Sequence, residues 1–128
     1  MHLLKKLPAL LVALVIWLLS AQSTLPLPDL GLTFTDKIAH FIAYAVLAFA
    51  CAFWLPRAAW TASAWRAALL VVLVTALYGL LDEFHQSFVP GRDTSLFDWL
   101  ADLAGACIGV SLFALVSRSI HGGDRRKP

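Results

Sequence analysis

Carboxylates gather in one short segment of an otherwise apolar chain. Residues 82–105 carry five of its eight acidic side chains, which are Asp82, Glu83, Asp93, Asp98 and Asp102. Long apolar stretches flank this segment on both sides. An ionised group near the centre of a bilayer costs roughly 3 kcal/mol or more, so acids within or beside a membrane span indicate a functional site.

Polar residues recur at four-residue intervals in three stretches of the chain. The sets are Asp36, His40 and Tyr44; Tyr78, Asp82 and Gln86; and Asp98 and Asp102. Residues four apart share one face of an α-helix. At 1.5 Å per residue, Asp82 and Asp102 each lie roughly 10–12 Å from the turn that would join their helices. We therefore expect three polar faces to meet in one layer around a water-filled cleft, because lipid cannot accept these groups.

The residue types in this layer suit both binding and catalysis. Asp82, Glu83 and His40 are the candidates for a general acid and base. Arg92 suits a phosphate or carboxylate group on a ligand. The predicted ligand-binding side chains are Asp36, Lys37, His40, Tyr44, Asp82, Glu83, Gln86, Arg92, Asp98 and Asp102.

Two of the acids also fit a purely structural role. Asp36 follows Thr33 by three residues, and Asp98 follows Ser95 by three, which is the spacing of a helix capping box. For these two acids, capping and ligand binding remain alternatives. Asp102 lies too deep in its predicted helix to act as a cap.

No metal or other cofactor is expected. The chain has enough oxygen and nitrogen ligands for Mg, Mn or Zn, at His40, Asp82, Glu83, His85, Asp98 and Asp102. However, their spacing matches no strict signature such as His-Glu-x-x-His. His40 or His85 alone would more often be a packing residue, and Arg92 alone could be an interfacial anchor.

Composition places the chain among membrane proteins. Only 14% of its 128 residues are charged, against about 25% in soluble domains, and its mean hydropathy is +0.78. The length suits a single domain, residues 1–128. A net charge of +2 with scattered basic residues argues against nucleic-acid binding. Cys51 and Cys107 lie in apolar runs, so they predict neither a disulfide nor a metal pair.

Four apolar runs predict four helices, at about 3–23, 36–55, 67–88 and 96–117. Short connections favour an antiparallel all-α transmembrane bundle with a flexible tail at 118–128. Residues 24–35 contain two prolines and a glycine and predict a loop. Pro90-Gly91 suits the central positions of a type II turn. The first run also resembles a signal peptide with a cleavage site at Ala21-Gln22-Ser23, but we favour an uncleaved helix.

Basic residues predict the orientation of this bundle. With both termini in the cytoplasm, eight Lys and Arg side chains lie on the inner side and only Lys37 and Arg92 on the outer side. This is the bias that the positive-inside rule describes. The polar layer then lies just below the extracytoplasmic surface.

Three motifs resemble the VanZ-like family of small bacterial membrane proteins, which is named after an accessory protein of teicoplanin resistance. They are Asp36-Lys37-x-x-His40-Phe41-x-x-Tyr44, Asp82-Glu83-x-x-Gln86-x-Phe88-x-Pro90-Gly91-Arg92 and Asp98-x-x-x-Asp102-x-x-Gly105. The resemblance covers roughly residues 33–116. It implies a multi-pass protein of the bacterial inner membrane, linked to the cell envelope or to glycopeptide tolerance, and it supplies no settled reaction. The family usually has Asn at the position of Asp102.

Three functions remain open at this point. The first is a binding module whose cleft takes a lipid headgroup, a cell-envelope precursor or an amphiphilic antibiotic. The second is an enzyme that uses carboxylate and histidine acid–base chemistry on a lipid-linked substrate at the outer leaflet. The third is a transporter or proton relay, which ranks last because the inner half of the predicted bundle is aliphatic and offers no polar exit.

Overall fold

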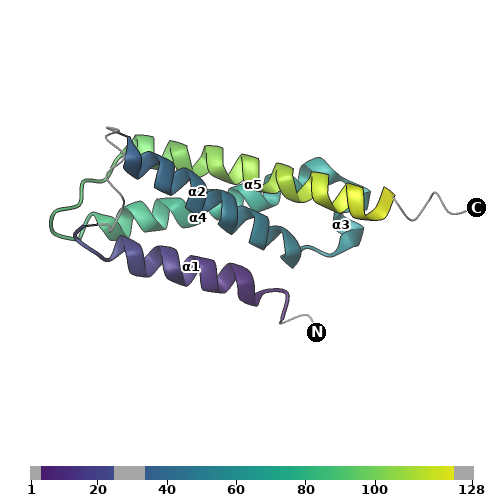
Figure 1. Cartoon of the computed structure of the whole chain (residues 1–128), viewed down its shortest axis with the longest axis horizontal. Coiled ribbons are helices and arrows are strands. Elements are labelled where there is room, and N and C mark those ends of the chain that lie inside the picture. Colours follow the sequence, from purple (N-terminus) through teal and green to yellow (C-terminus); the bar gives the residue numbers. More distant parts are fainter. Residues whose placement is uncertain (1–3, 25–33, 123–128) are drawn as a thin grey trace, which may run out of the picture.

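The computed structural model describes residues 4–24 and 34–122, and every regular element in these ranges is helical. The elements are α1 (Leu7–Ser20), α2 (Thr35–Cys51), the 3-10 turn η1 (Ala52–Trp54), α3 (Arg57–Ala62), α4 (Ala64–Gln86) and α5 (Leu96–Gly122). Helices α1, α2, α4 and α5 lie side by side along one long axis (Figure 1). The short helix α3 lies at the end of this bundle where α1 begins and α5 ends (Figure 1).

Three helical segments are long and apolar enough to cross a membrane: Thr35–Trp54, Ala64–Gln86 and Leu96–Arg118. Leucines on the outer side of α4, such as Leu73, Leu77 and Leu80, are exposed, as lipid-facing side chains would be. The chain is therefore a helical membrane protein by length and composition. The number of spans and their orientation stay predictions.

The first helix is shorter than the predicted 3–23. It has 14 residues, and at 1.5 Å per residue it measures roughly 21 Å, less than the roughly 30 Å of a hydrocarbon core. Pro8 lies in its first turn, where the missing N–H costs no hydrogen bond, so the helix begins there rather than at Leu3. At the other end, Ala21 closes the helix with a hydrogen bond to the Trp17 carbonyl.

Other boundaries also differ from the prediction, including the end of α4, which is at Gln86 rather than at 88. Helix α2 ends at Cys51 and tightens into η1, after which Leu55 is extended, as the residue before a proline usually is. Residues 57–62 of the predicted connector form α3, and α4 starts at Ala64 rather than at 67. Helix α5 runs to Gly122, so the first part of the predicted tail is helical. The rest of that tail and most of the predicted loop at 24–35 lie outside the described residues.

Helices α2 and α5 pack with their backbones in close approach. A Cβ atom on Gly105 would overlap the carbonyl oxygen of Phe41, and one on Gly109 would overlap that of Ala45. Small residues at four-residue spacing are what allows two membrane helices to come this near. The neighbour that these two glycines admit is α2.

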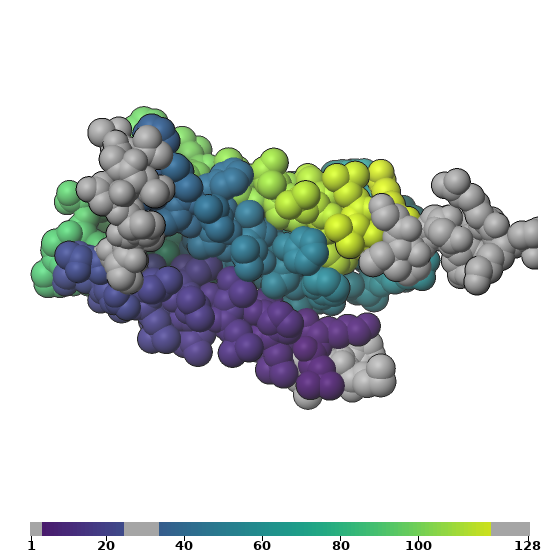
Figure 2. All heavy atoms as spheres, viewed as in Figure 1, coloured from purple at the N-terminus to yellow at the C-terminus, as the bar shows by residue number. Residues whose placement is uncertain are grey.

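Helix α1 covers one side of this core. Its Ala9 and Ile16 are buried in the apolar cluster formed with α2, α4 and α5. The Tyr78 hydroxyl of α4 donates a hydrogen bond of 2.6 Å to the Ala13 carbonyl of α1. Trp17 stacks on His85 with ring centroids 3.9 Å apart. The space-filling view shows α1 as a layer lying along α2 (Figure 2).

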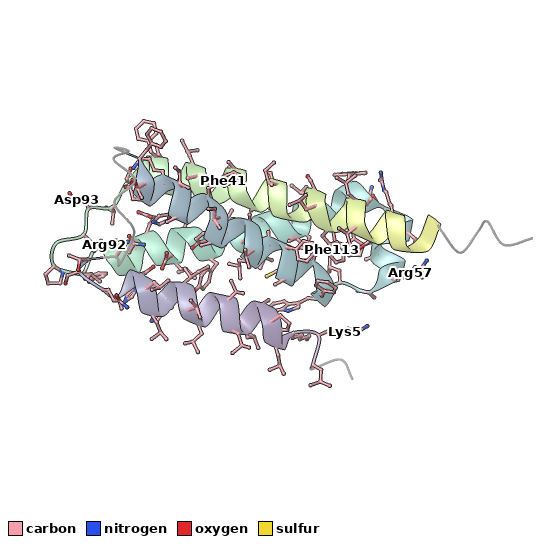
Figure 3. The ribbon with its side chains drawn as sticks, in the orientation of Figure 1. Lys5, Phe41, Arg57, Arg92, Asp93 and Phe113 are labelled. Atoms are coloured by element: carbon pink, nitrogen blue, oxygen red, sulfur yellow. The ribbon has the colours of Figure 1, made fainter. Side chains whose placement is uncertain are left out.

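Charged side chains lie at the two ends of the bundle. Lys5 and Arg57 mark one end, and Arg92 and Asp93 mark the other (Figure 3). Because Arg66 begins α4 and Arg118 lies near the end of α5, they belong to the end of Lys5 and Arg57. The described basic residues thus separate as the sequence predicted.

Candidate functional site

A cavity of about 80 Å³ opens between α1, α2 and α4, near the end of the bundle that carries Arg92. Its polar lining consists of Ser20, His40, Tyr44, Asp82 and Arg92. Its apolar lining consists of Ile16, Leu19, Ala39 and Ala43. The expectation that α2, α4 and α5 would enclose the cleft is wrong in one respect. Helix α1 is the third helix that lines the cavity, since its last turn reaches the polar layer. Helix α5 lies behind that layer.

Asp82 is the centre of one hydrogen-bond network at this cavity. Its side chain is 1% exposed. The Ser20 hydroxyl donates to Asp82 Oδ2 at 2.9 Å, and Gln86 Nε2 donates to the same oxygen at 3.2 Å. Arg92 Nη2 in turn donates to Gln86 Oε1 at 2.9 Å. Residues from α1, α4 and the following turn are thereby tied to one buried carboxylate.

The turn after α4 places Arg92 beside the cavity. The Arg92 N–H donates to the Val89 carbonyl at 3.2 Å, and Gly91 has a φ of +82°. These are the features of a type II turn with Pro90 and Gly91 at its centre, as predicted. A side chain at Gly91 would strain that backbone, so the glycine is required for the position of Arg92.

A second network joins α2 to α5 behind the cavity. His40 Nδ1 lies 2.9 Å from Asp102 Oδ1, and Asp102 is fully buried. Asp102 fits because Gly79 faces it from α4; a Cβ there would come within 2.9 Å of Asp102 Oδ2. One turn nearer the start of α5, Lys37 Nζ lies 3.0 Å from Asp98 Oδ1 and 3.0 Å from Asp36 Oδ2.

Glu83 lies beside this second network, within 4.8 Å of His40 and Asp98, although it is one residue from Asp82. Its carboxylate points toward α5, where Glu83 Oε2 accepts the backbone N–H of Ser95 at 3.1 Å. That N–H precedes the first turn of α5. In the predicted capping box Asp98 would accept this N–H, but Glu83 accepts it instead. The capping interpretation of Asp98 is therefore wrong, because its carboxylate pairs with Lys37 instead. Thr33, the proposed partner of Asp36, lies outside the described residues.

Several buried polar atoms in this layer have no hydrogen-bond partner among the described residues. They are Tyr44 Oη, Asp82 Oδ1, Glu83 Oε1 and Asp102 Oδ2, and His85 Nδ1 nearby on α4 is also without a partner. Buried polar atoms are nearly always paired in native proteins. Four such atoms in one layer are what a site that holds a polar ligand or an ion would present.

The family model of VanZ/LLP1 matches residues 2–117. The chain belongs to the VanZ/LLP1 family. The resemblance drawn from the three motifs is thus confirmed, and all ten predicted site residues lie within the matched range. No curated protein and no solved structure matches the chain.

In this VanZ/LLP1 chain nine of the ten predicted site residues lie in or beside the two hydrogen-bond networks, whereas the Tyr44 ring stacks near His40 and its hydroxyl has no partner among the described residues. Asp36, Lys37 and Arg92 are partly exposed, and the other seven residues are buried. His85 is not among them; it stacks on Trp17, which fits the packing role considered for it.

Sequence reasoning missed two contributors to the site. Ser20 lies at the end of α1 and hydrogen-bonds to Asp82, and Gly79 makes room for Asp102. The sequence signal for Ser20 is that it carries the one hydroxyl group within the apolar run 7–21. A polar group in such a run needs a polar partner on another helix. Gly79 carries no chemistry, and only the packing reveals its role.

Proposed function

We propose that this chain binds the polar part of an amphiphilic cell-envelope molecule in the cavity between α1, α2 and α4. A lipid headgroup, a lipid-linked precursor and a lipoglycopeptide share the chemistry required, an ionic or hydroxylated head joined to an apolar chain. The observation that carries the proposal is the composition of the lining, which sets Arg92, His40 and Asp82 beside apolar side chains of α1 and α2.

The polar end of the cavity offers both signs of charge. A guanidinium has five N–H donors, and Gln86 accepts from one nitrogen of Arg92, so further donors remain for a phosphate or carboxylate. Asp82 Oδ1 is buried without a partner among the described residues and suits an amine or a sugar hydroxyl. The cavity has room for several water-sized groups, which suits a small head.

The apolar wall suits the rest of such a ligand. Leu19 is partly exposed on α1 while also lining the cavity, and Ile16 lies one turn away. An acyl or aryl chain that leaves the cavity along α1 would stay in contact with the apolar side chains of that helix. In the predicted orientation this opening faces the outer half of the bacterial inner membrane.

Replacement of Arg92 tests the proposal. We expect overexpression of the wild type to raise teicoplanin tolerance. We expect Arg92→Ala to reduce both this tolerance and the amount of lipid that co-purifies with the protein in mild detergent, by roughly tenfold for the loss of one charge-assisted contact. Arg57→Ala, which removes an arginine at the opposite end of the bundle, is the matched control. Equal lipid content and equal tolerance in the wild type and both variants would contradict the proposal.

An enzyme is the second candidate, and the His40–Asp102 pair favours it. A histidine that lines a cavity and is held by a buried carboxylate has the arrangement of a general base. His40→Gln and Asp82→Asn separate the two functions, because both keep hydrogen-bonding capacity while removing acid–base chemistry. Retained tolerance with retained lipid favours binding, whereas lost tolerance with retained lipid favours catalysis.

A further inference from the structure

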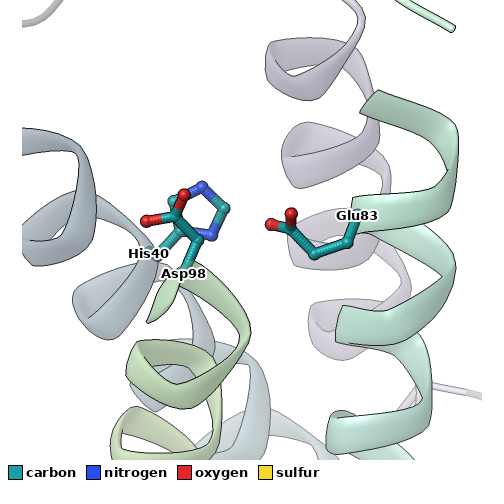
Figure 4. Close-up of side chains that lie close together, drawn as sticks. All are labelled: His40, Glu83 and Asp98. Atoms are coloured by element: carbon teal, nitrogen blue, oxygen red, sulfur yellow. The ribbon is translucent and has the colours of Figure 1, made fainter. Parts of the chain in front are cut away.

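Three side chains from three helices converge beside the cavity. His40 of α2, Glu83 of α4 and Asp98 of α5 each place a ligand atom within 4.8 Å of the other two. The carboxylate of Glu83 points across the gap toward the other two side chains (Figure 4). All three are buried, with Glu83 9% exposed.

Each of these three side chains uses one polar atom to bond a neighbouring group and keeps a second polar atom for a ligand. His40 Nδ1 bonds Asp102, which leaves Nε2 for a ligand. Glu83 Oε2 accepts the Ser95 N–H, which leaves Oε1 buried and without a partner among the described residues. Asp98 Oδ1 accepts from Lys37 Nζ, which leaves Oδ2. Supporting contacts of this kind orient the ligands of metal ions, and a carboxylate behind a ligating histidine is the commonest example.

The charge balance around these residues favours a cation. Asp82, Glu83, Asp98 and Asp102 are four buried carboxylates. Besides His40, which lies 2.9 Å from Asp102, two basic side chains contact this layer in the described structure, Lys37 through Asp98 and Arg92 through Gln86. Buried charges are normally paired or bound to a metal, so this excess of negative charge calls for compensation.

We propose that His40, Glu83 and Asp98 bind one divalent transition-metal ion, with Zn²⁺ as the reference metal. One imidazole and two carboxylates suit Zn²⁺ or Mn²⁺ better than Ca²⁺ or Mg²⁺, which prefer oxygen ligands alone. Three protein ligands leave a coordination position for water or a ligand group, as in catalytic zinc sites. The inference concerns the metal and stands whether or not the cavity binds an amphiphile.

Metal binding would draw the three side chains together. Bonds of about 2 Å place two ligands of one ion at most about 4 Å apart, which is less than the present spread. We expect rotation about the side-chain bonds of Glu83 to supply this movement, since its longer side chain reaches in from α4 (Figure 4).

Metal analysis of the full chain tests the proposal. The protein is purified in detergent with a histidine-free tag, exchanged against a Zn²⁺ buffer and measured by mass spectrometry. We expect about one Zn²⁺ per wild-type chain, and at least a tenfold loss in Glu83→Gln and in His40→Ala. Asp93→Asn and His85→Ala make the same chemical changes outside the cluster and should keep the metal.

A supporting residue provides an independent readout. Asp102→Asn leaves the three ligands in place and removes the charge behind His40, so we expect the affinity for Zn²⁺ to fall by about tenfold, not to vanish. With Co²⁺ in place of Zn²⁺, the absorption spectrum reports the ligands directly and should change in Asp98→Asn. A wild-type chain that binds neither metal would overturn the proposal, as would binding that survives both Glu83→Gln and His40→Ala.

Discussion

At the scale of single residues, Asp82 and Glu83 show how neighbours in sequence reach different surroundings. On a helix they differ by about 100° in direction. Asp82 therefore faces α1 and the cavity, where Ser20 and Gln86 donate to it, while Glu83 faces the start of α5. These two adjacent residues of α4 therefore connect the two sides of the site.

Ser20 should matter for stability although sequence reasoning passed over it. We expect Ser20→Ala to destabilise the protein by about 1–2 kcal/mol, because a buried carboxylate loses a hydrogen-bond donor. Unfolding followed in detergent by heat or by SDS titration measures this. Ser111→Ala is the control, since that hydroxyl is exposed on α5 and bonds only the Cys107 carbonyl of its own helix in the described structure. Equal losses in both variants would mean that the contact with Asp82 contributes nothing.

At the scale of elements, the close pairing of α2 and α5 sets the geometry of the site. Lys37 and His40 on α2 reach Asp98 and Asp102 on α5 at about 3 Å only because the helix backbones approach so nearly. Gly105 and Gly109 permit that approach. The two glycines thus determine the distances between the charged side chains of α2 and those of α5.

A methyl group at Gly105 tests this link. We expect Gly105→Ala to push α5 away from Phe41 and to cost roughly 1–3 kcal/mol, as overpacking of a tight interface does. It should also lower the proposed Zn²⁺ affinity, because Asp98 would move away from His40. Ala104→Leu adds a larger group on the exposed side of α5 and should leave both quantities unchanged. Thermal unfolding and metal titration are the two measurements.

At the scale of the whole molecule, the bundle has charged side chains at its two ends and an apolar surface between them. Basic side chains such as Lys5 and Arg57 lie at one end, and the site with Arg92 lies at the other (Figure 3). Between them, exposed leucines cover the outside of the helices. The positive-inside rule then predicts that the site end faces away from the cytoplasm.

Cysteine labelling in intact cells tests this orientation. Thr94→Cys lies in the exposed turn at the site end, and Thr61→Cys lies at the exposed opposite end. In a background without Cys51 and Cys107, we expect a membrane-impermeant maleimide to label position 94 in intact cells and position 61 only after lysis. The reverse pattern would invert the predicted topology, and with it the placement of the cavity in the outer half of the membrane.

The sequence by itself determined which residues form the polar layer and which segments must hold them. Four-residue spacing assigns side chains to helix faces, and polar groups in an apolar chain must turn inward, so these two rules alone place Asp82, His40 and Asp102 in one layer. Local rules also anticipated the turn at Pro90-Gly91. They did not anticipate the start of α1 or the helix at 57–62, because helix ends depend on packing as much as on propensity.

Only the tertiary structure decided which side chains of the polar layer contact one another. Which helix lies next to which is a property of long-range packing, and the α4–α1 contact carried no signal in the spacing of residues. The structure therefore revealed that Ser20 faces Asp82, that Glu83 caps α5 and so releases Asp98, and that His40, Glu83 and Asp98 converge. Periodicity gives the face on which a side chain lies, whereas its partner depends on how closely two backbones can approach.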